Sequence, residues 1–109
     1  MIFVTVAAFL LAQLSLSAFA GVIPLAISSG NQASHTCSVF PGGAAKCWGY
    51  NYAGQLGLQT YANRGNGKLQ MGNDLPNISL GNGQNASSMA TGFFHTCAIL
   101  TGGGLKCWG

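Results

Sequence analysis

Residues 35–49, HTCSVFPGGAAKCWG, return as residues 95–109, HTCAILTGGGLKCWG, and this repeated stretch decides the fold. The histidine, threonine, both cysteines, lysine, tryptophan and three glycines recur at a constant offset of 60 residues. Residues 27–30 (ISSG) also resemble residues 89–92 (MATG), so the repeated unit begins before the histidine. Self-similarity at a fixed period indicates a repeat architecture, in which each unit packs against its neighbours.

Each copy is predicted to form a β-hairpin around a glycine-rich centre, at residues 41–43 and 101–104. Glycines at a loop tip adopt the positive φ angles that short hairpins need. A three-residue loop places the two cysteines of each copy opposite one another, and period-2 alternation sorts the side chains onto two faces. One face holds Cys37, Val39, Ala45 and Cys47, matched by Cys97, Ile99, Leu105 and Cys107. The other face holds Phe40, Lys46 and Trp48, matched by Leu100, Lys106 and Trp108. Apolar residues on both faces predict a hairpin packed between two neighbours.

The segments between the copies predict further strands and loops. Residues 22–27 and 75–81 have the apolar or alternating patterns of short strands. Residues 59–74 and 82–88 are rich in polar and turn-forming residues and predict exposed loops. No amphipathic helix of useful length is expected after residue 20.

The first 20 residues are predicted to be a secretory signal peptide. An apolar run ends in Ala18-Phe19-Ala20, a pattern typical of signal cleavage, which would make Gly21 the mature start. The alternative is an uncleaved membrane anchor formed by residues 1–27, because no Lys or Arg precedes Lys46.

The mature region, residues 21–109, is therefore expected outside the cell or at its surface. Four cysteines in two equally spaced pairs agree with an oxidising compartment. The sequons at Asn77 and Asn85 are possible glycosylation sites.

Composition excludes several functional classes. The chain has 17 glycines, only five charged residues and a net charge of +3, and none of its basic residues is adjacent to another. It therefore has no basic stripe for a nucleic-acid backbone. Asp74 is the only carboxylate side chain, so mechanisms that need paired acids are excluded within this chain. Gly-x-Ser-x-Gly and phosphate-loop motifs are also missing, and we expect neither catalysis nor a cofactor.

The paired cysteines have three interpretations. Two cross-strand disulfides, Cys37–Cys47 and Cys97–Cys107, are favoured because cysteines that face each other across a hairpin lie within bridging distance. Buried free thiols are one alternative. A zinc site is another, but each copy supplies one histidine and two cysteines and lacks a fourth ligand.

The repeated histidines and tryptophans are predicted to be structural. His35 and His95 start apolar strands and have no recurring acid or nucleophile beside them, so a packing role is favoured over catalysis. Trp48 and Trp108 are expected to pack between neighbouring units, with ligand stacking as the alternative.

Four strings together resemble the regulator of chromosome condensation repeat: residues 46–49 (KCWG), 54–57 (GQLG), 71–76 (MGNDLP) and 92–98 (GFFHTCA). The resemblance implies an all-β fold that is part of a β-propeller, in which about seven four-stranded blades close a ring. Copies are expected at residues 27–86 and 87–109, which is about one full blade period plus part of a second. We therefore expect an incomplete segment of a longer propeller, or a short chain that assembles with others.

The resemblance implies a binding role rather than a chemical one. The cysteine-containing repeats with a signal peptide are similar to secreted or surface members of the family. The leading hypothesis is a non-catalytic scaffold that binds an unidentified protein, with remaining blades supplied by the same or another chain. Guanine-nucleotide exchange on a small GTPase, by family analogy, and an appended domain of a larger enzyme are the alternatives. A membrane contact is expected only if residues 1–27 stay attached.

Overall fold

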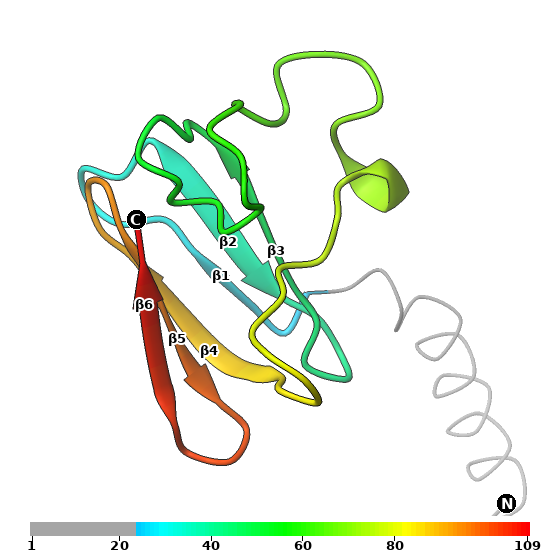
Figure 1. The fold of residues 1–109 in the computed structure, drawn as a ribbon, viewed down its shortest axis with the longest axis vertical. Coiled ribbons are helices and arrows are strands. Elements are labelled where there is room, and N and C mark those ends of the chain that lie inside the picture. Colours follow the sequence, from blue (N-terminus) through cyan, green and yellow to red (C-terminus); the bar gives the residue numbers. More distant parts are fainter. Residues whose placement is uncertain (1–23) are drawn as a thin grey trace, which may run out of the picture.

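The computed structural model describes residues 24–109, which form two antiparallel sheets of three strands each (Figure 1). The first sheet contains β1 (Ala26–Ser28), β2 (His35–Val39) and β3 (Ala45–Gly49). The second contains β4 (Ala86–Thr91), β5 (Thr96–Leu100) and β6 (Leu105–Trp108). Within the described residues the one helical element is a short 3₁₀ turn, η1 (Gly72–Asp74). The all-β prediction is confirmed.

Both hairpins have the predicted register. Cys37 pairs with Cys47 in the first sheet and Cys97 with Cys107 in the second. The Phe40 amide donates to the Ala44 carbonyl at 2.8 Å, which closes the first three-residue loop. Because hydrogen-bonded and non-hydrogen-bonded pairs alternate along an antiparallel ladder, each cysteine pair falls at a non-hydrogen-bonded position, where side chains lie closest.

The β1–β2 and β4–β5 pairings also correspond. Ser28 lies opposite Cys37, and Ala90 lies opposite Cys97. The likeness between residues 27–30 and 89–92 therefore reflects the same place in the two sheets, and the loop that follows is two residues longer in the first.

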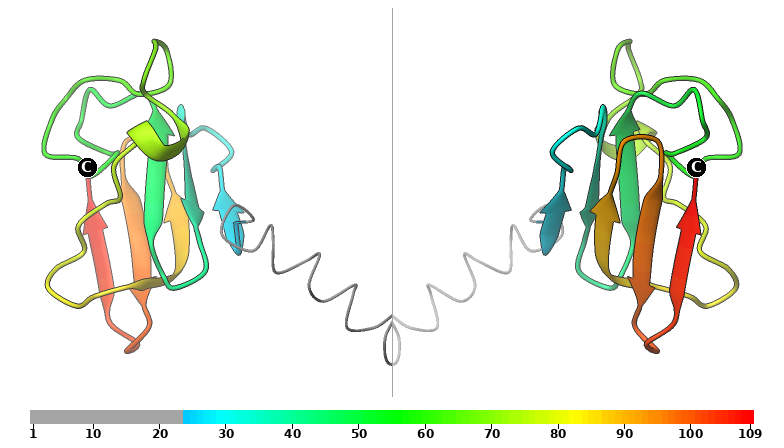
Figure 2. Two further views of the ribbon diagram at one scale, coloured as in Figure 1. Left: turned by 90° about the vertical axis from the view of Figure 1, so that its right-hand side faces the viewer. Right: turned by 90° about the vertical axis from the view of Figure 1, so that its left-hand side faces the viewer.

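The two sheets stack face to face, and the core lies between them (Figures 1 and 2). The cysteine-bearing face of the first sheet packs against the face of the second sheet that carries Ala98 and Leu100. Leu56, Ile78 and Leu80, from the segment that connects the sheets, complete the cluster. Each sheet alone would leave this apolar face in water, so the stability of both depends on their contact.

Three predicted boundaries are wrong. Residues 75–81 do not form a strand, and only the Ile78 amide joins the ladder, through a 2.8 Å bond to the Ala45 carbonyl. Their apolar alternation reflects burial of Leu75, Ile78 and Leu80 against the core, while Pro76 has no amide hydrogen to donate. The strand predicted at residues 22–27 is shorter and lies later in the chain, as β1 (Ala26–Ser28). Residues 22 and 23 of the predicted strand lie outside the described part. The loop predicted at 82–88 ends early, because small polar residues enter β4 beside a bulge between Ala86 and Ser88.

Each sheet has three strands where the resemblance implies four. The free edge of β3 is covered by irregular chain, through two backbone bonds between Gly49 and Arg64 and the bond from Ile78. In the first sheet, irregular segments therefore occupy part of the place beside β3 where a fourth strand would lie. The predicted signal peptide, residues 1–20, lies outside the described residues.

Candidate functional site

The four cysteines form two disulfides, Cys37–Cys47 and Cys97–Cys107. Their bonding excludes the free-thiol and zinc alternatives, because no thiolate remains in either hairpin. The two bridges differ in exposure. Cys37 and Cys47 are buried in the core, whereas Cys97 is half-buried and Cys107 is exposed. We refer to them as the buried and the exposed disulfide.

His35 is the centre of a buried polar contact between the sheets. Its Nε2 lies 2.7 Å from the hydroxyl of Thr96, which in turn donates to the Gln55 carbonyl at 2.7 Å. Both side chains are buried, with His35 2% exposed and Thr96 fully covered. The contact thus joins β2, β5 and the turn after the first hairpin.

The geometry sets the protonation of His35. A threonine hydroxyl has one hydrogen, and that hydrogen points to Gln55, so the hydroxyl must accept from His35 Nε2–H. The neutral ring then carries no proton on Nδ1, and this atom is buried with no hydrogen-bond partner among the described residues. Protonation would place an unpaired N–H there. Burial therefore lowers the pKa of His35 from 6.5, and the charge of His95 lowers it further.

Trp108 makes a further polar contact, with the segment that connects the two sheets. Its indole Nε1–H donates to the same Gln55 carbonyl at 3.0 Å. The ring lies over Gly57, where an added Cβ would come 2.8 Å from Nε1. Gly57 also has a φ of +69°, so its lack of a side chain serves both the turn and the close approach of Trp108.

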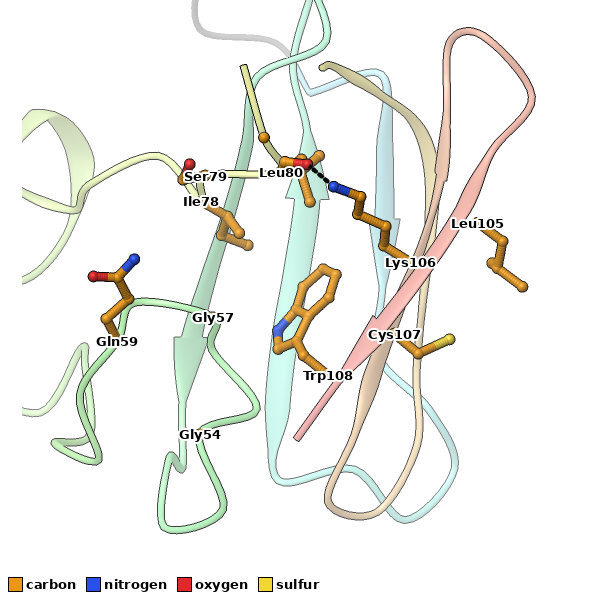
Figure 3. Close-up of a pocket in the computed structure, with 11 residues that line it drawn as sticks. Gly54, Gly57, Gln59, Ile78, Ser79, Leu80, Leu105, Lys106, Cys107 and Trp108 are labelled. Carbon is orange, nitrogen blue, oxygen red and sulfur yellow. Dashed lines mark hydrogen bonds between the residues drawn. The ribbon is translucent and has the colours of Figure 1, made fainter. Parts of the chain in front are cut away.

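A groove of about 740 Å³ runs between β6 and the segment that connects the two sheets. All four β6 residues line it, together with parts of residues 54–59 and 78–81. Figure 3 shows Trp108 and Lys106 on one side of β6 and Leu105 and Cys107 on the other. The Lys106 ammonium donates to the Leu80 carbonyl at 2.5 Å, so the lysine links β6 to the opposite wall of the groove.

Within residues 24–109, nothing covers the side of the second sheet that faces away from the first sheet. We call it the open face; it comprises Ser88, Ala90, Cys97, Ile99, Leu105 and Cys107. Ile99 is 47% exposed and Leu105 is 68% exposed, whereas their counterparts Val39 and Ala45 are each 1% exposed. His95 is exposed and His35 is buried. The same face of the repeated unit is thus a core in one copy and a surface in the other.

The structure places the other predicted residues as follows. Trp48 is half-buried, and its side chain lies beside Gly65 of the long loop rather than between the sheets. Asn77 and Asn85 are both exposed. Loop 59–74 is largely exposed, as predicted.

Two important residues were not singled out from the sequence: Thr96 and Gln55, which form the buried contact with His35. Asn51, on which the sequence predicts a turn with Gly54, is fully buried and orders that turn. The Asn51 side chain accepts from the Leu56 amide at 2.9 Å and donates to the Thr60 and Ala62 carbonyls. The repeated threonine was the available signal for Thr96, since it recurs in both copies beside the histidine.

Among residues 24–109, no group of three potential metal-binding side chains comes together. In that same part of the chain, no helix has the length and apolar character needed to cross a bilayer.

Comparison with known proteins supports the repeat assignment. The family model described as the regulator of chromosome condensation (RCC1) repeat matches residues 86–109, which is the second sheet. The predicted resemblance is confirmed for this segment. No curated protein matches the chain.

Among solved structures, the chain is similar to the entire ectodomain of the Physcomitrella patens receptor kinase CR4, with a TM-score of 0.49 and 25% sequence identity. The match covers 79% of this chain and 18% of that chain. The chain thus spans less than a fifth of the length of this structural relative.

Proposed function

We propose that this chain is a non-catalytic repeat module of a secreted or cell-surface protein, and that it binds a protein partner through the open face. The observation that carries the proposal is the contrast between the two sheets. Matched apolar positions are covered in the first sheet and exposed in the second. A contiguous patch of exposed apolar residues on one face of a sheet, such as the open face, is typical of an interaction surface.

The disulfides favour an extracellular setting. Disulfides persist in oxidising compartments and are rare in the cytosol and nucleus. A guanine-nucleotide exchange factor would act in one of those reducing compartments, so the paired cysteines favour the scaffold over that alternative.

Photo-cross-linking tests the binding face. A benzophenone amino acid replaces Leu105 on the open face, and in a control protein it replaces Leu69, which is 77% exposed on the long loop. We expect protein capture from position 105 and none from position 69. An added I99D substitution should abolish capture from position 105, because a carboxylate would be buried at the contact. Equal capture from both positions, or capture unaffected by I99D, would refute the proposal.

Secretion is tested separately. The protein is expressed with a C-terminal tag and recovered from the medium for N-terminal sequencing. We expect the mature chain to start at Gly21, with all four cysteines alkylated only after reduction. A tagged protein that remains in the cytosol with alkylatable cysteines contradicts the extracellular assignment.

A further inference from the structure

A small pocket lies on the loops that follow the first hairpin, and it is not part of the open face. Its volume is about 190 Å³. It adjoins the groove beside β6, and Figure 3 shows two residues that line both hollows, Gly54 and Gln59, on the wall opposite β6. We call it the tyrosine pocket; its lining residues are Ala53, Gly54, Gln59, Thr60 and Tyr61.

Tyr61 forms the aromatic wall of this pocket. A Cβ added to Gly54 would lie 3.6 Å from Tyr61 Cε1, so the ring packs against the backbone of the turn. The tyrosine is nevertheless 74% exposed, which leaves most of its surface open to a ligand. A tyrosine offers a large apolar ring and a hydroxyl group, and it loses little conformational entropy on binding because its side chain has few torsions.

The backbone that carries Tyr61 is fixed by a buried side chain. The side-chain amide of Asn51, which is fully buried, donates to the carbonyls of Thr60 and Ala62 at 2.7 and 2.9 Å. These two residues are the neighbours of Tyr61 in the chain. The backbone amide of Asn51 donates to Asn63 Oδ1 at 2.8 Å, which fixes the same segment one residue further on. The pocket is therefore formed before a ligand arrives, and binding orders little additional chain.

Gln59 and Thr60 supply the polar side chains of the pocket, and both are exposed. The glutamine amide and the threonine hydroxyl can each donate and accept hydrogen bonds. Gln59 has a φ of +60°, which is uncommon for a residue other than glycine. A conformation of this kind persists only where the surrounding structure imposes it, so the fold sets the position of Gln59 at the pocket.

The chemistry of the tyrosine pocket favours a neutral ligand rich in hydroxyl groups. The chain has no charged side chain from Cys47 to Asn63. Arg64 follows, but its backbone is bonded to Gly49 at the edge of β3, and it does not line the pocket. A sugar ring matches this lining, because its C–H groups pack on an aromatic ring while its hydroxyls donate and accept hydrogen bonds. A stable protein–protein interface needs a larger surface than this pocket offers.

We propose that the tyrosine pocket binds one sugar residue of a neutral oligosaccharide. The apolar side of the sugar ring packs on Tyr61, and its hydroxyl groups bond to Gln59 and Thr60. A single sugar residue in an open pocket has few atoms in contact, so we expect a Kd on the order of 1 mM. This inference goes beyond the proposed function, because it adds a glycan site on the loops to a protein-binding site on the open face.

A glycan array tests the proposal. The full disulfide-bonded chain is biotinylated on a C-terminal tag and multimerised on streptavidin, so that avidity makes weak binding detectable. The array carries neutral gluco-, manno-, galacto- and xylo-oligosaccharides beside uronic-acid and sulfated ones. We expect binding to a subset of the neutral glycans that is equal at low and high salt, because salt screens only interactions between charges. Titration of the best neutral glycan, followed by NMR, then gives the Kd of the single chain.

Tyr52 provides the matched control, because it is 77% exposed and does not line the pocket. A Y61A substitution should weaken binding on the order of 10-fold, whereas Y52A should leave the Kd unchanged. A Q59G substitution suits the positive φ and removes the amide, and it should weaken binding about 5-fold. All three side chains are exposed, so the variants should keep the circular dichroism spectrum and both disulfides.

Three outcomes would overturn the inference: no neutral glycan is bound, only acidic glycans are bound and salt weakens them, or Y52A weakens binding as much as Y61A does. Loss of protein capture from position 105 in a Y61A background would also overturn it, because the pocket would then belong to the protein-binding surface. Glycan binding that fails while capture from position 105 persists leaves the proposed function intact and removes only the glycan site.

Discussion

The hydroxyl of Thr96 connects two buried groups, the His35 ring and the Gln55 carbonyl, and its removal tests the account of this contact. In a T96V variant the methyl group that replaces the hydroxyl has nearly the same volume, so packing in β5 is kept. The His35 Nε2–H loses its acceptor, and the Gln55 carbonyl loses one of its two donors. The carbonyl retains the bond from Trp108 Nε1–H at 3.0 Å.

These losses set the expected magnitude. A buried N–H donor left without an acceptor costs about 1–3 kcal/mol, and the lost bond to Gln55 adds about 1 kcal/mol. The free energy of unfolding should therefore fall by about 2–4 kcal/mol. In a domain of this size each kcal/mol lowers Tm by about 4–8 °C, so a fall of about 8–32 °C is expected.

Thr36 provides the matched control, because it is the same residue at the same place in the first hairpin. Thr36 is half-buried on the side of the first sheet that faces away from the second sheet, and a T36V substitution should change the free energy of unfolding by no more than about 0.5 kcal/mol. Urea unfolding at pH 7.5, followed by tryptophan fluorescence, measures both variants. Equal effects of T96V and T36V, or a T96V effect below about 0.5 kcal/mol, would refute the assigned hydrogen-bond network.

Three further predictions concern pH, the turn and the disulfides. Because the pKa of His35 is lowered in the folded state, this histidine takes up a proton at a higher pH in the unfolded chain than in the folded one. The free energy of unfolding should therefore be constant above pH 6.5 and should decrease as the pH falls from 6.5 to the folded-state pKa. Urea unfolding between pH 5 and 8 measures this pH dependence, which an H35Q variant should lose. A free energy of unfolding that rises on acidification would contradict the prediction. A G57A substitution should destabilise the chain by about 2 kcal/mol or more, since it adds the contact with Trp108 to the strain at positive φ. G83A is the control in thermal unfolding, because Gly83 has a similar φ of +66° and open space around it, and an equal loss in both would show that Trp108 contributes nothing. Dilute reductant should open the exposed disulfide before the buried one, as read by timed alkylation and peptide mass mapping, with the reverse order refuting the assigned exposures. Loss of one bridge should cost about 3 kcal/mol in the loop-entropy treatment.

Local features of the hairpins could be predicted from the sequence. The spacing of Cys37 and Cys47 around a glycine-rich loop determined the register, because period-2 alternation leaves few ways to pair so short a hairpin. The repeat at an offset of 60 then predicted that the second hairpin forms in the same way, and its register is the same. Residues 75–81 were misassigned because alternating burial against a core produces the same pattern as a strand.

The sequence by itself determined that this chain contains two equivalent disulfide hairpins, since turn chemistry and alternation act over neighbouring residues. Only the tertiary structure decided what the two copies do. Although both histidines begin an identical His-Thr-Cys string, His35 lies in a buried contact and His95 is exposed. The difference comes from stacking, because burial depends on what lies against a face, and the second sheet lies against the first while its own open face has nothing over it among the described residues.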